Sequence, residues 1–434
     1  MRALIIIFLM SLVLMSNKCT LKTKGAMTYK ARKIEINNNI PSKKLDIQGK
    51  IILEENEEVI LHKIEGIEIF ENASKMILTD PASKTAVLYD YNSGDILKYI
   101  DSEKQNYEWL DHFLNTKPEA FSALIDNLKF IPLSECSKYG ITELGKELVT
   151  FLFWSPKISN DRIIISFIIH TWAVSDKEEN HNSIMNRTGF CIYDKELNFK
   201  KMIVPEVQSG SFVITGSYDI LSNGNFISIS SNFVHQEKNV MDSLVSVTRY
   251  DSTGKLMGNI GYLPEKYANN NLAYEEMWQP LITSIDDNIF IAYPRTSEIY
   301  APGQKVRFSL QNLPFSNDSG MVYIYNYYRM SKVQQRRPDS KEIGRLLPLS
   351  IVHTFNSNGN YGVIVLVFDE EHPMGFYYIA QEYDLEGELL SQTIIHDEPE
   401  NQIRNFYFDK YNNHLCLVKK SNKSGWTIEK RRWQ

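Results

Sequence analysis

The chain has little cysteine and lacks the short motifs that mark most enzyme classes. Its 434 residues contain four cysteines, at positions 19, 136, 191 and 416, and none forms a CxxC pair, so the usual zinc and redox motifs are absent. No GxSxG, GxxxxGK, GxGxxG or HExxH motif occurs. We therefore expect no cofactor, no metal site and no catalytic residue. One disulfide among Cys136, Cys191 and Cys416, or three buried free thiols, remain alternatives.

Concentrated positive charge is also missing. The formal net charge is −6 at pH 7, and the longest terminal basic cluster is Lys430-Arg431-Arg432. A nucleic-acid-binding protein would need a basic patch or stripe that neutralises phosphates. We therefore expect no nucleic-acid partner.

Aromatic residues, in contrast, are abundant. They make up 12% of the chain, with 24 Tyr and 21 Phe. Such residues fit the pleated, half-buried surface of a β-sheet. The composition therefore favours a well-packed all-β protein.

The N-terminus has the layout of a secretory signal peptide. Arg2 supplies one positive charge, and the residues from Ala3 to Met15 are apolar except for Ser11. This run is shorter than the roughly 20 apolar residues that span a bilayer. A buried core helix is the alternative, but it would need a polar face. We predict a signal peptide over residues 1–18 and hence export.

Cys19 follows this apolar run directly, as the lipid-carrying cysteine does in a bacterial lipobox. The preceding Lys18 departs from the pattern, because a small residue normally stands there. We expect lipid attachment at Cys19, a flexible polar tether over residues 19–44, and a periplasmic, outer-membrane or cell-surface location. The membrane would then be contacted through the lipid anchor only. An ordinary cleaved signal or an uncleaved anchor is the alternative.

A hairpin with a Tyr-Asp turn recurs along the chain. Three copies contain Tyr89-Asp90, Tyr250-Asp251 and Tyr383-Asp384, each followed by a glycine and a second strand. A degenerate copy contains Tyr193-Asp194, with Asn198 in place of the glycine. The Asp can accept hydrogen bonds from turn amides, and the Gly can take the positive φ that closes the turn.

A second hairpin precedes these, with an Asn-Gly turn at Asn223-Gly224 and again at Asn358-Gly359. One hairpin of each kind makes four antiparallel strands, which is one blade of a β-propeller. We predict one domain over residues 45–434 with six blades, or seven, and a short helical insertion near 107–128. The predicted blade limits are 66–101, 147–205, 216–261, 280–328, 349–396 and 402–433. The segment 45–53 would close the last blade. A two-domain β-sandwich is the competing fold.

With its signal, loose lipobox and Tyr-Asp hairpins, the chain resembles the uncharacterised lipoproteins of Bacteroidetes-type bacteria that form six-bladed, TolB-like propellers. The resemblance covers roughly residues 45–433 and rests on structural motifs. It implies the fold and the compartment. The family has no assigned catalytic residues, so the resemblance implies none here.

A propeller binds ligands where its loops and strand ends converge around the axis. Polar and aromatic residues at predicted strand ends are therefore the candidates, and ordinary blade packing is their alternative role. The ligand-binding candidates are Trp154, His170, Trp172, Trp278, Tyr293 and Arg295.

These features favour a non-catalytic binding module whose partner is an envelope protein, a peptide or a glycan. The alternative is a propeller enzyme acting on polysaccharide as a lyase or hydrolase. That alternative requires His, Tyr, Arg or carboxylate side chains to converge at the axis. A purely structural subunit of an envelope complex is a third possibility.

Overall fold

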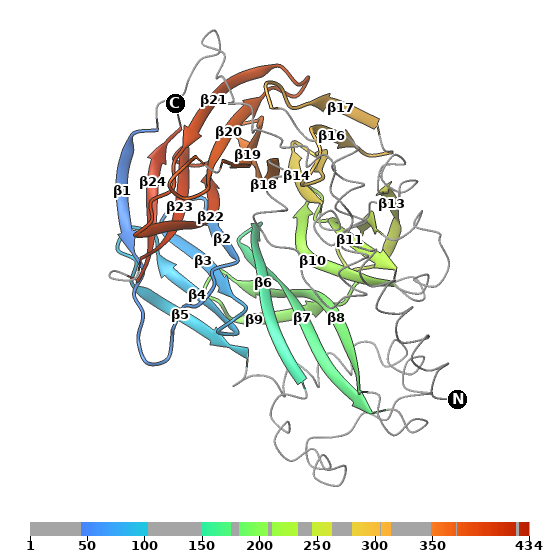
Figure 1. The fold of residues 1–434 in the computed structure, drawn as a ribbon. Coiled ribbons are helices and arrows are strands. Elements are labelled where there is room, and N and C mark those ends of the chain that lie inside the picture. Colours follow the sequence, from blue (N-terminus) through green and yellow to red (C-terminus); the bar gives the residue numbers. More distant parts are fainter. Residues whose placement is uncertain are drawn as a thin grey trace, which may run out of the picture.

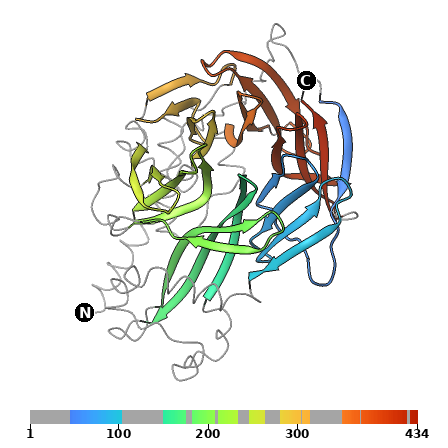
Figure 2. The same cartoon turned by 180° about the vertical axis from the view of Figure 1, so that it is seen from behind.

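The computed structural model describes residues 45–102, 149–174, 182–206, 211–232, 245–262, 280–303, 305–313, 349–369, 371–421 and 425–433. The described residues form twenty-four strands in six four-stranded sheets. Paired strands are antiparallel throughout, and the six sheets stand around a common axis (Figure 1 and Figure 2). The chain is therefore a six-bladed β-propeller, as predicted, and not a seven-bladed one or a pair of sandwiches.

Blades one to three each run from a strand at the axis to a strand at the rim. Blade one consists of β2 (Gly66–Ile69), β3 (Lys75–Asp80), β4 (Thr85–Asp90) and β5 (Ile96–Asp101). Blade two consists of β6 (Val149–Ser159), β7 (Arg162–Val174), β8 (Asn182–Asp194) and β9 (Phe199–Ile203). Blade three consists of β10 (Ser211–Ile220), β11 (Phe226–Asn232), β12 (Val245–Tyr250) and β13 (Leu256–Tyr262).

Blades four and five repeat this order, and blade six takes its rim strand from the other end of the described chain. Blade four consists of β14 (Leu281–Ile285), β15 (Asn288–Ala292), β16 (Glu298–Ala301) and β17 (Lys305–Ser309). Blade five consists of β18 (Leu349–Ser357), β19 (Asn360–Phe368), β20 (Phe376–Tyr383) and β21 (Leu389–Ile395). Blade six consists of β22 (Asn401–Asp409), β23 (His414–Ser421), β24 (Gly425–Arg432) and β1 (Ile47–Ile52).

The predicted blade limits agree closely with the strands except in blade four. The predicted end of that blade at Tyr328 is wrong, because β17 already ends at Ser309. The reason is a tight turn through Gly303, which has a φ of 80° and brings β17 back directly after β16. Blade four therefore closes with much shorter strands than expected.

Several predictions concern residues that the structure does not describe. The signal peptide of 1–18, the tether of 19–44 with Cys19, the insertion near 107–128 and Cys136 lie outside the described residues. Cys191 and Cys416 are described, and both are buried free thiols in different blades. A disulfide between these two cysteines is therefore excluded.

Closure of the ring by the N-terminal strand, predicted for 45–53, is confirmed. β1 pairs with β24 in antiparallel register, with Ile51 opposite Ile428. The pairing continues beyond the strand, since the Leu53 amide donates to the Trp426 carbonyl at 3.0 Å. The blue β1 lies beside the red β24 in both views (Figure 1 and Figure 2). The sheet edge that blade six would otherwise leave open is thereby covered.

Hydrophobic cores lie between adjacent blades. Ile77 and Leu88 of blade one pack with Phe153 of blade two in one such cluster. Met76 of blade one packs with Trp426 of blade six in another. Since each sheet is covered on both faces, its central strands are apolar on both sides, and each blade depends on its two neighbours for burial.

The Tyr-Asp turns have the predicted chemistry. Asp90 Oδ1 accepts hydrogen bonds from the amides of Asn92 and Ser93, at 2.8 and 2.9 Å. Asp384 Oδ1 likewise accepts two turn amides, at 3.0 and 2.7 Å. In the degenerate copy, Asn198 was expected to take the place of the glycine with positive φ. This expectation is wrong, because Leu197 has the positive φ, at 60°. Burial of the Leu197 side chain in the core between blades one and two compensates for this strained backbone.

In blades one, three and five, these turns also dock the blade against the previous one. The Gly94 carbonyl accepts the amide of Glu54, at 2.9 Å, and the Gly254 carbonyl accepts that of Glu206, at 2.8 Å. The Gly387 carbonyl accepts the side-chain amide of Gln311, at 3.1 Å. The glycines are therefore required for close approach between blades as well as for the turn itself.

A comparison of two glycines tests this second role. Gly387 and Gly359 have almost the same φ, 93° and 92°, but a Cβ on Gly387 would lie 2.2 Å from Phe308 Cβ, whereas one on Gly359 meets nothing within 4 Å. We expect Gly359→Ala to lower the free energy of unfolding by about 1 kcal/mol through backbone strain alone. Gly387→Ala should lower it by about 1–3 kcal/mol more, because the blades must separate. Urea unfolding measures both variants, and equal losses would contradict the docking role.

Candidate functional site

The six inner strands surround an axial cavity of about 1500 Å³. Adjacent inner strands contact one another all the way round, so the wall is continuous. Every blade contributes side chains to this wall, and its residues include charged, hydroxyl and amide groups. A concave space with convergent polar groups is the default candidate for a binding site in a propeller.

Irregularities in the inner strands place the polar residues. The register shifts within β6, β10, β18 and β22, in each case next to residues that line the cavity. In β18 the shift falls between Ile351 and His353, and in β6 it ends at Pro156, directly before Lys157. A β-bulge re-aims the side chains that follow it. Local strand geometry thus turns polar residues of otherwise apolar strands toward the axis.

Lys157 and Asp219 join blades two and three across the wall. Lys157 Nζ lies 3.7 Å from Asp219 Oδ1. Asp219 Oδ2 also accepts the amide and the hydroxyl of Ser284 in blade four, at 2.6 and 2.7 Å. Burial disfavours the ammonium, but the carboxylates of Asp219 and Glu68 outweigh it and raise the pKa of Lys157. Lys157 is therefore a cation at neutral pH.

Glu68 and Tyr407 join blade one to blade six. The Tyr407 hydroxyl donates to Glu68 Oε1 at 3.3 Å and accepts the Ile69 amide at 3.2 Å. Burial raises the pKa of Glu68, while the Lys157 charge opposes this rise. Glu68 is thus a carboxyl group that takes up a proton more readily than an exposed glutamate.

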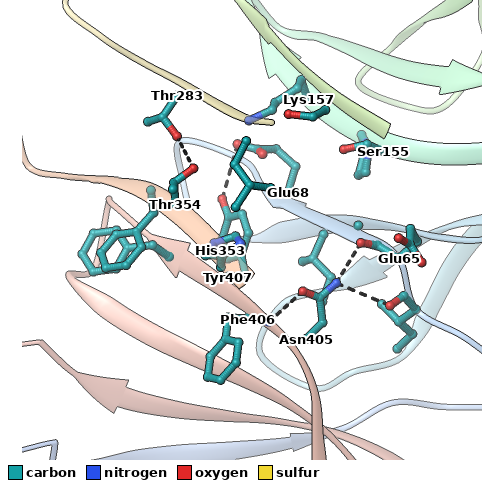
Figure 3. A pocket seen from close by; sticks show the side chains of 18 of the residues that line it. Glu65, Glu68, Ser155, Lys157, Thr283, His353, Thr354, Asn405, Phe406 and Tyr407 are labelled. Atoms are coloured by element: carbon teal, nitrogen blue, oxygen red, sulfur yellow. Dashed lines mark hydrogen bonds between the residues drawn. The ribbon is translucent and has the colours of Figure 1, made fainter. Parts of the chain in front are cut away.

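His353 of β18 faces the same cavity. Figure 3 shows His353, Glu68, Lys157 and Tyr407 gathered from four different blades. Burial, and then the charge of Lys157, lower the pKa of His353 to about 4. The imidazole is consequently neutral at pH 7 and offers one donor and one acceptor.

Trp154 lies on the cavity wall in β6, beside a second group of polar contacts. Lys63 Nζ lies 5.6 Å from the centre of its ring and also pairs with Glu65 at 2.8 Å. The Asn405 side chain donates to the Glu65 carbonyl at 2.7 Å. Backbone and side-chain contacts between blades six, one and two therefore hold this part of the wall.

Of the three predicted ligand-binding residues whose side chains the structure describes, one lines this cavity. Trp154 lines it. Tyr293 is fully buried and packs edge-on against Tyr300 at 5.6 Å, and Arg295 donates to the Leu349 carbonyl at 3.2 Å. Neither is among the cavity-lining residues. His170 and Trp172 belong to β7, but their side chains lie outside the described part of the chain, as does Trp278.

Sequence reasoning missed the charged and titratable residues of the wall. Those within the inner strands and gathered from different blades include Glu68, Lys157, Asp219, His353 and Tyr407. A signal for them exists, since each stands among apolar residues in the first strand of its blade. A charged residue in the innermost strand of a blade, whose two faces are buried, is expected to point toward the axis.

No group of three or more His, Cys, Asp or Glu side chains in the described ranges is arranged to hold a metal ion. Within the same ranges, no helix is long and apolar enough to cross a membrane.

Comparison with models of known protein families gives no match, and comparison with curated proteins gives none either. Among solved structures, the chain is similar to a Bacteroides fragilis protein inferred to be exported, with 11% identity, a TM-score of 0.48, and coverage of 90% of this chain and 95% of that one. A member of the DUF4221 family from Bacteroides vulgatus has 8% identity and a TM-score of 0.47, and the match covers 91% of this chain and 99% of that one. A PQQ-bound aldose sugar dehydrogenase from Streptomyces coelicolor has 9% identity and a TM-score of 0.41, and the match covers 90% of this chain and 99% of that one. Similarity at this level concerns the fold alone.

The neutral state of buried His353 predicts a pH dependence of stability. Its pKa falls from an ordinary 6.5 to about 4 on folding, so the unfolded chain binds the proton more tightly. Stability is therefore lost as the pH falls from 6.5 toward 4, by about 2 kcal/mol from this residue after allowing for partial exposure. The His353→Asn variant lacks this titrating group. Between pH 6.5 and 4 its free energy of unfolding should therefore fall by about 2 kcal/mol less than that of the wild type.

Urea unfolding at pH 7, 5 and 4 checks this expectation. His62→Asn is the matched control, because His62 is exposed. Parallel pH profiles for the wild type and His353→Asn would show that the imidazole is not held neutral by the fold.

Proposed function

We propose that this protein is an exported, non-catalytic binding module that takes a polar ligand into its axial cavity. The observation that carries this proposal is the wall itself, to which each of the six blades contributes and on which Glu68, Lys157 and His353 converge. Nothing in the sequence marks a catalytic motif. A rigid ring with a polar interior suits binding, because the groups are held in place before the ligand arrives.

The compartment is part of the same proposal. Residues 1–18 would direct export, Cys19 would carry a lipid, and residues 19–44 would tether a TolB-like propeller to a membrane of the envelope. An envelope glycan, peptide or protein would then be the source of the ligand. Support for this location comes from the apolar run before Cys19.

A second candidate function is an enzyme acting on polysaccharide, as a lyase or hydrolase. His353 keeps an unprotonated ring nitrogen at pH 7, and the Tyr407 hydroxyl and Glu68 carboxyl line the same cavity. This combination of a base and a proton donor is what acid–base catalysis needs. Turnover of a glycan that His353→Asn abolishes would establish the enzyme and overturn the non-catalytic role.

Blocking the cavity tests the binding role. Val352 lines the cavity and is 37% exposed, so Val352→Trp should fill part of the space without disrupting a core. The matched control is Val306→Trp, on rim strand β17, where the side chain is 50% exposed. Calorimetry with soluble envelope glycans and peptides should show at least tenfold weaker binding for Val352→Trp and unchanged binding for Val306→Trp. Unchanged binding in both variants would place the site elsewhere.

A further inference from the structure

Some polar side chains of the cavity wall already use their hydrogen-bonding capacity within the protein, and others have donors or acceptors left for a ligand. Asp219 is committed, because its two oxygens accept the Ser284 amide and hydroxyl, the Ile220 amide and the Lys157 ion pair. Thr283 and Thr354 bond to each other at 2.7 Å. Tyr407 already donates one hydrogen bond and accepts another. These groups shape the wall, and their main hydrogen-bonding capacity is used.

Capacity for a ligand remains on Glu68, Lys157 and His353, and the exposed side chains of Arg404 and Lys410 line the cavity as well. Among the described contacts, Glu68 has one hydrogen bond, the 3.3 Å one from Tyr407, so its second oxygen remains an acceptor. Lys157 has a single ion pair at 3.7 Å and a side chain that is 32% exposed, so N–H groups remain. His353 has ring contacts with Phe355 but no hydrogen bond in the described part of the chain. The cavity thus offers an anion, a cation and a neutral imidazole together (Figure 3).

This set disfavours a charged ligand of either sign. A carboxylate on Lys157 would also lie close to Asp219, whose oxygen is 3.7 Å from the same ammonium. An ammonium on Glu68 would face the charges of Lys157 and Lys410, which already act on that carboxyl. Like charges held near each other in such a space repel strongly. A zwitterion meets the same obstacle through its carboxylate.

Hydroxyl groups meet no such obstacle. A hydroxyl donates to Glu68 and accepts from Lys157, and a second hydroxyl can use either nitrogen of His353. Hydrogen bonds to charged groups are stronger than those between neutral groups. Trp154 lines the same cavity and supplies apolar surface for the C–H face of a sugar ring. The volume of about 1500 Å³ leaves room for several rings.

We infer that the axial cavity binds a neutral saccharide, whose hydroxyl groups are held by Glu68, Lys157 and His353. This inference rests on the proposed binding function and names its ligand class. It requires selection against acidic sugars as well as affinity for neutral ones, and the carboxylates of Asp219 and Glu68, which both act on Lys157, supply that selection.

The probes are neutral hexasaccharides of glucose, mannose, galactose and xylose, hexagalacturonate as the acidic sugar, and one acidic and one basic hexapeptide. Calorimetry uses the purified full-length protein. We expect at least one neutral hexasaccharide to bind at least tenfold more tightly than hexagalacturonate and both peptides.

Substitutions then test the named residues. Glu68→Gln should weaken the neutral sugar about tenfold and strengthen hexagalacturonate, because one repelling charge is removed. Lys157→Gln should weaken the neutral sugar without helping the acidic one. Glu57→Gln, at an exposed position outside the strands, is the control and should change neither. Glu68→Gln is nearly isosteric, and thermal unfolding confirms that each variant folds.

The outcomes distinguish the choice of a neutral saccharide as ligand from the proposed binding role of the axial cavity. If a peptide or hexagalacturonate binds most tightly and Val352→Trp blocks it, the saccharide class is overturned while cavity binding stands. If Val352→Trp leaves every interaction intact, both are overturned. Failure of all neutral hexasaccharides to bind at millimolar concentration overturns the saccharide class, as does a Glu68→Gln variant with unchanged selectivity.

Discussion

The pairing of β1 with β24 is the constraint on which the rest of the molecule depends. A propeller blade has two unpaired edges and two apolar faces, and only a closed ring buries the faces of every blade. Here the closing strand comes from one end of the described chain and the other three strands of blade six from its opposite end. Blades six and one share a hydrophobic cluster and the hydrogen bond from Tyr407 to Glu68. Loss of closure would therefore open the cavity wall at Glu68 as well as expose an edge.

Outside the axis, the blades are joined by a repeated device. The Tyr-Asp turns place a glycine carbonyl against the previous blade, as Gly94 does with Glu54 and Gly254 does with Glu206. The axis follows the opposite rule, since each inner strand brings a different polar side chain to the wall. The repeated residues thus determine the ring, and the residues that differ between blades give the cavity its chemistry.

The charges of the cavity are mutually compensating rather than concentrated. Lys157 lies between Asp219 and Glu68, so neither a purely acidic nor a purely basic surface results. Burial keeps His353 neutral and makes Glu68 easier to protonate. A wall of this kind interacts best with groups that both donate and accept hydrogen bonds.

The sequence by itself determined the ring: the turns at Asp90, Asp251 and Asp384, the second set of hairpins and a spare strand near Ile51 were enough to predict a closed propeller of six or seven blades, of which the structure has six. Those features are local, because a turn depends on residues a few positions apart. Only the tertiary structure decided which side chains meet at the axis. Glu68 and Tyr407 are 339 positions apart, and bulges in the inner strands shift the alternation of faces that periodicity assumes. Aromatic residues at strand ends were therefore a poor guide, since Trp154 reached the cavity while Tyr293 became core.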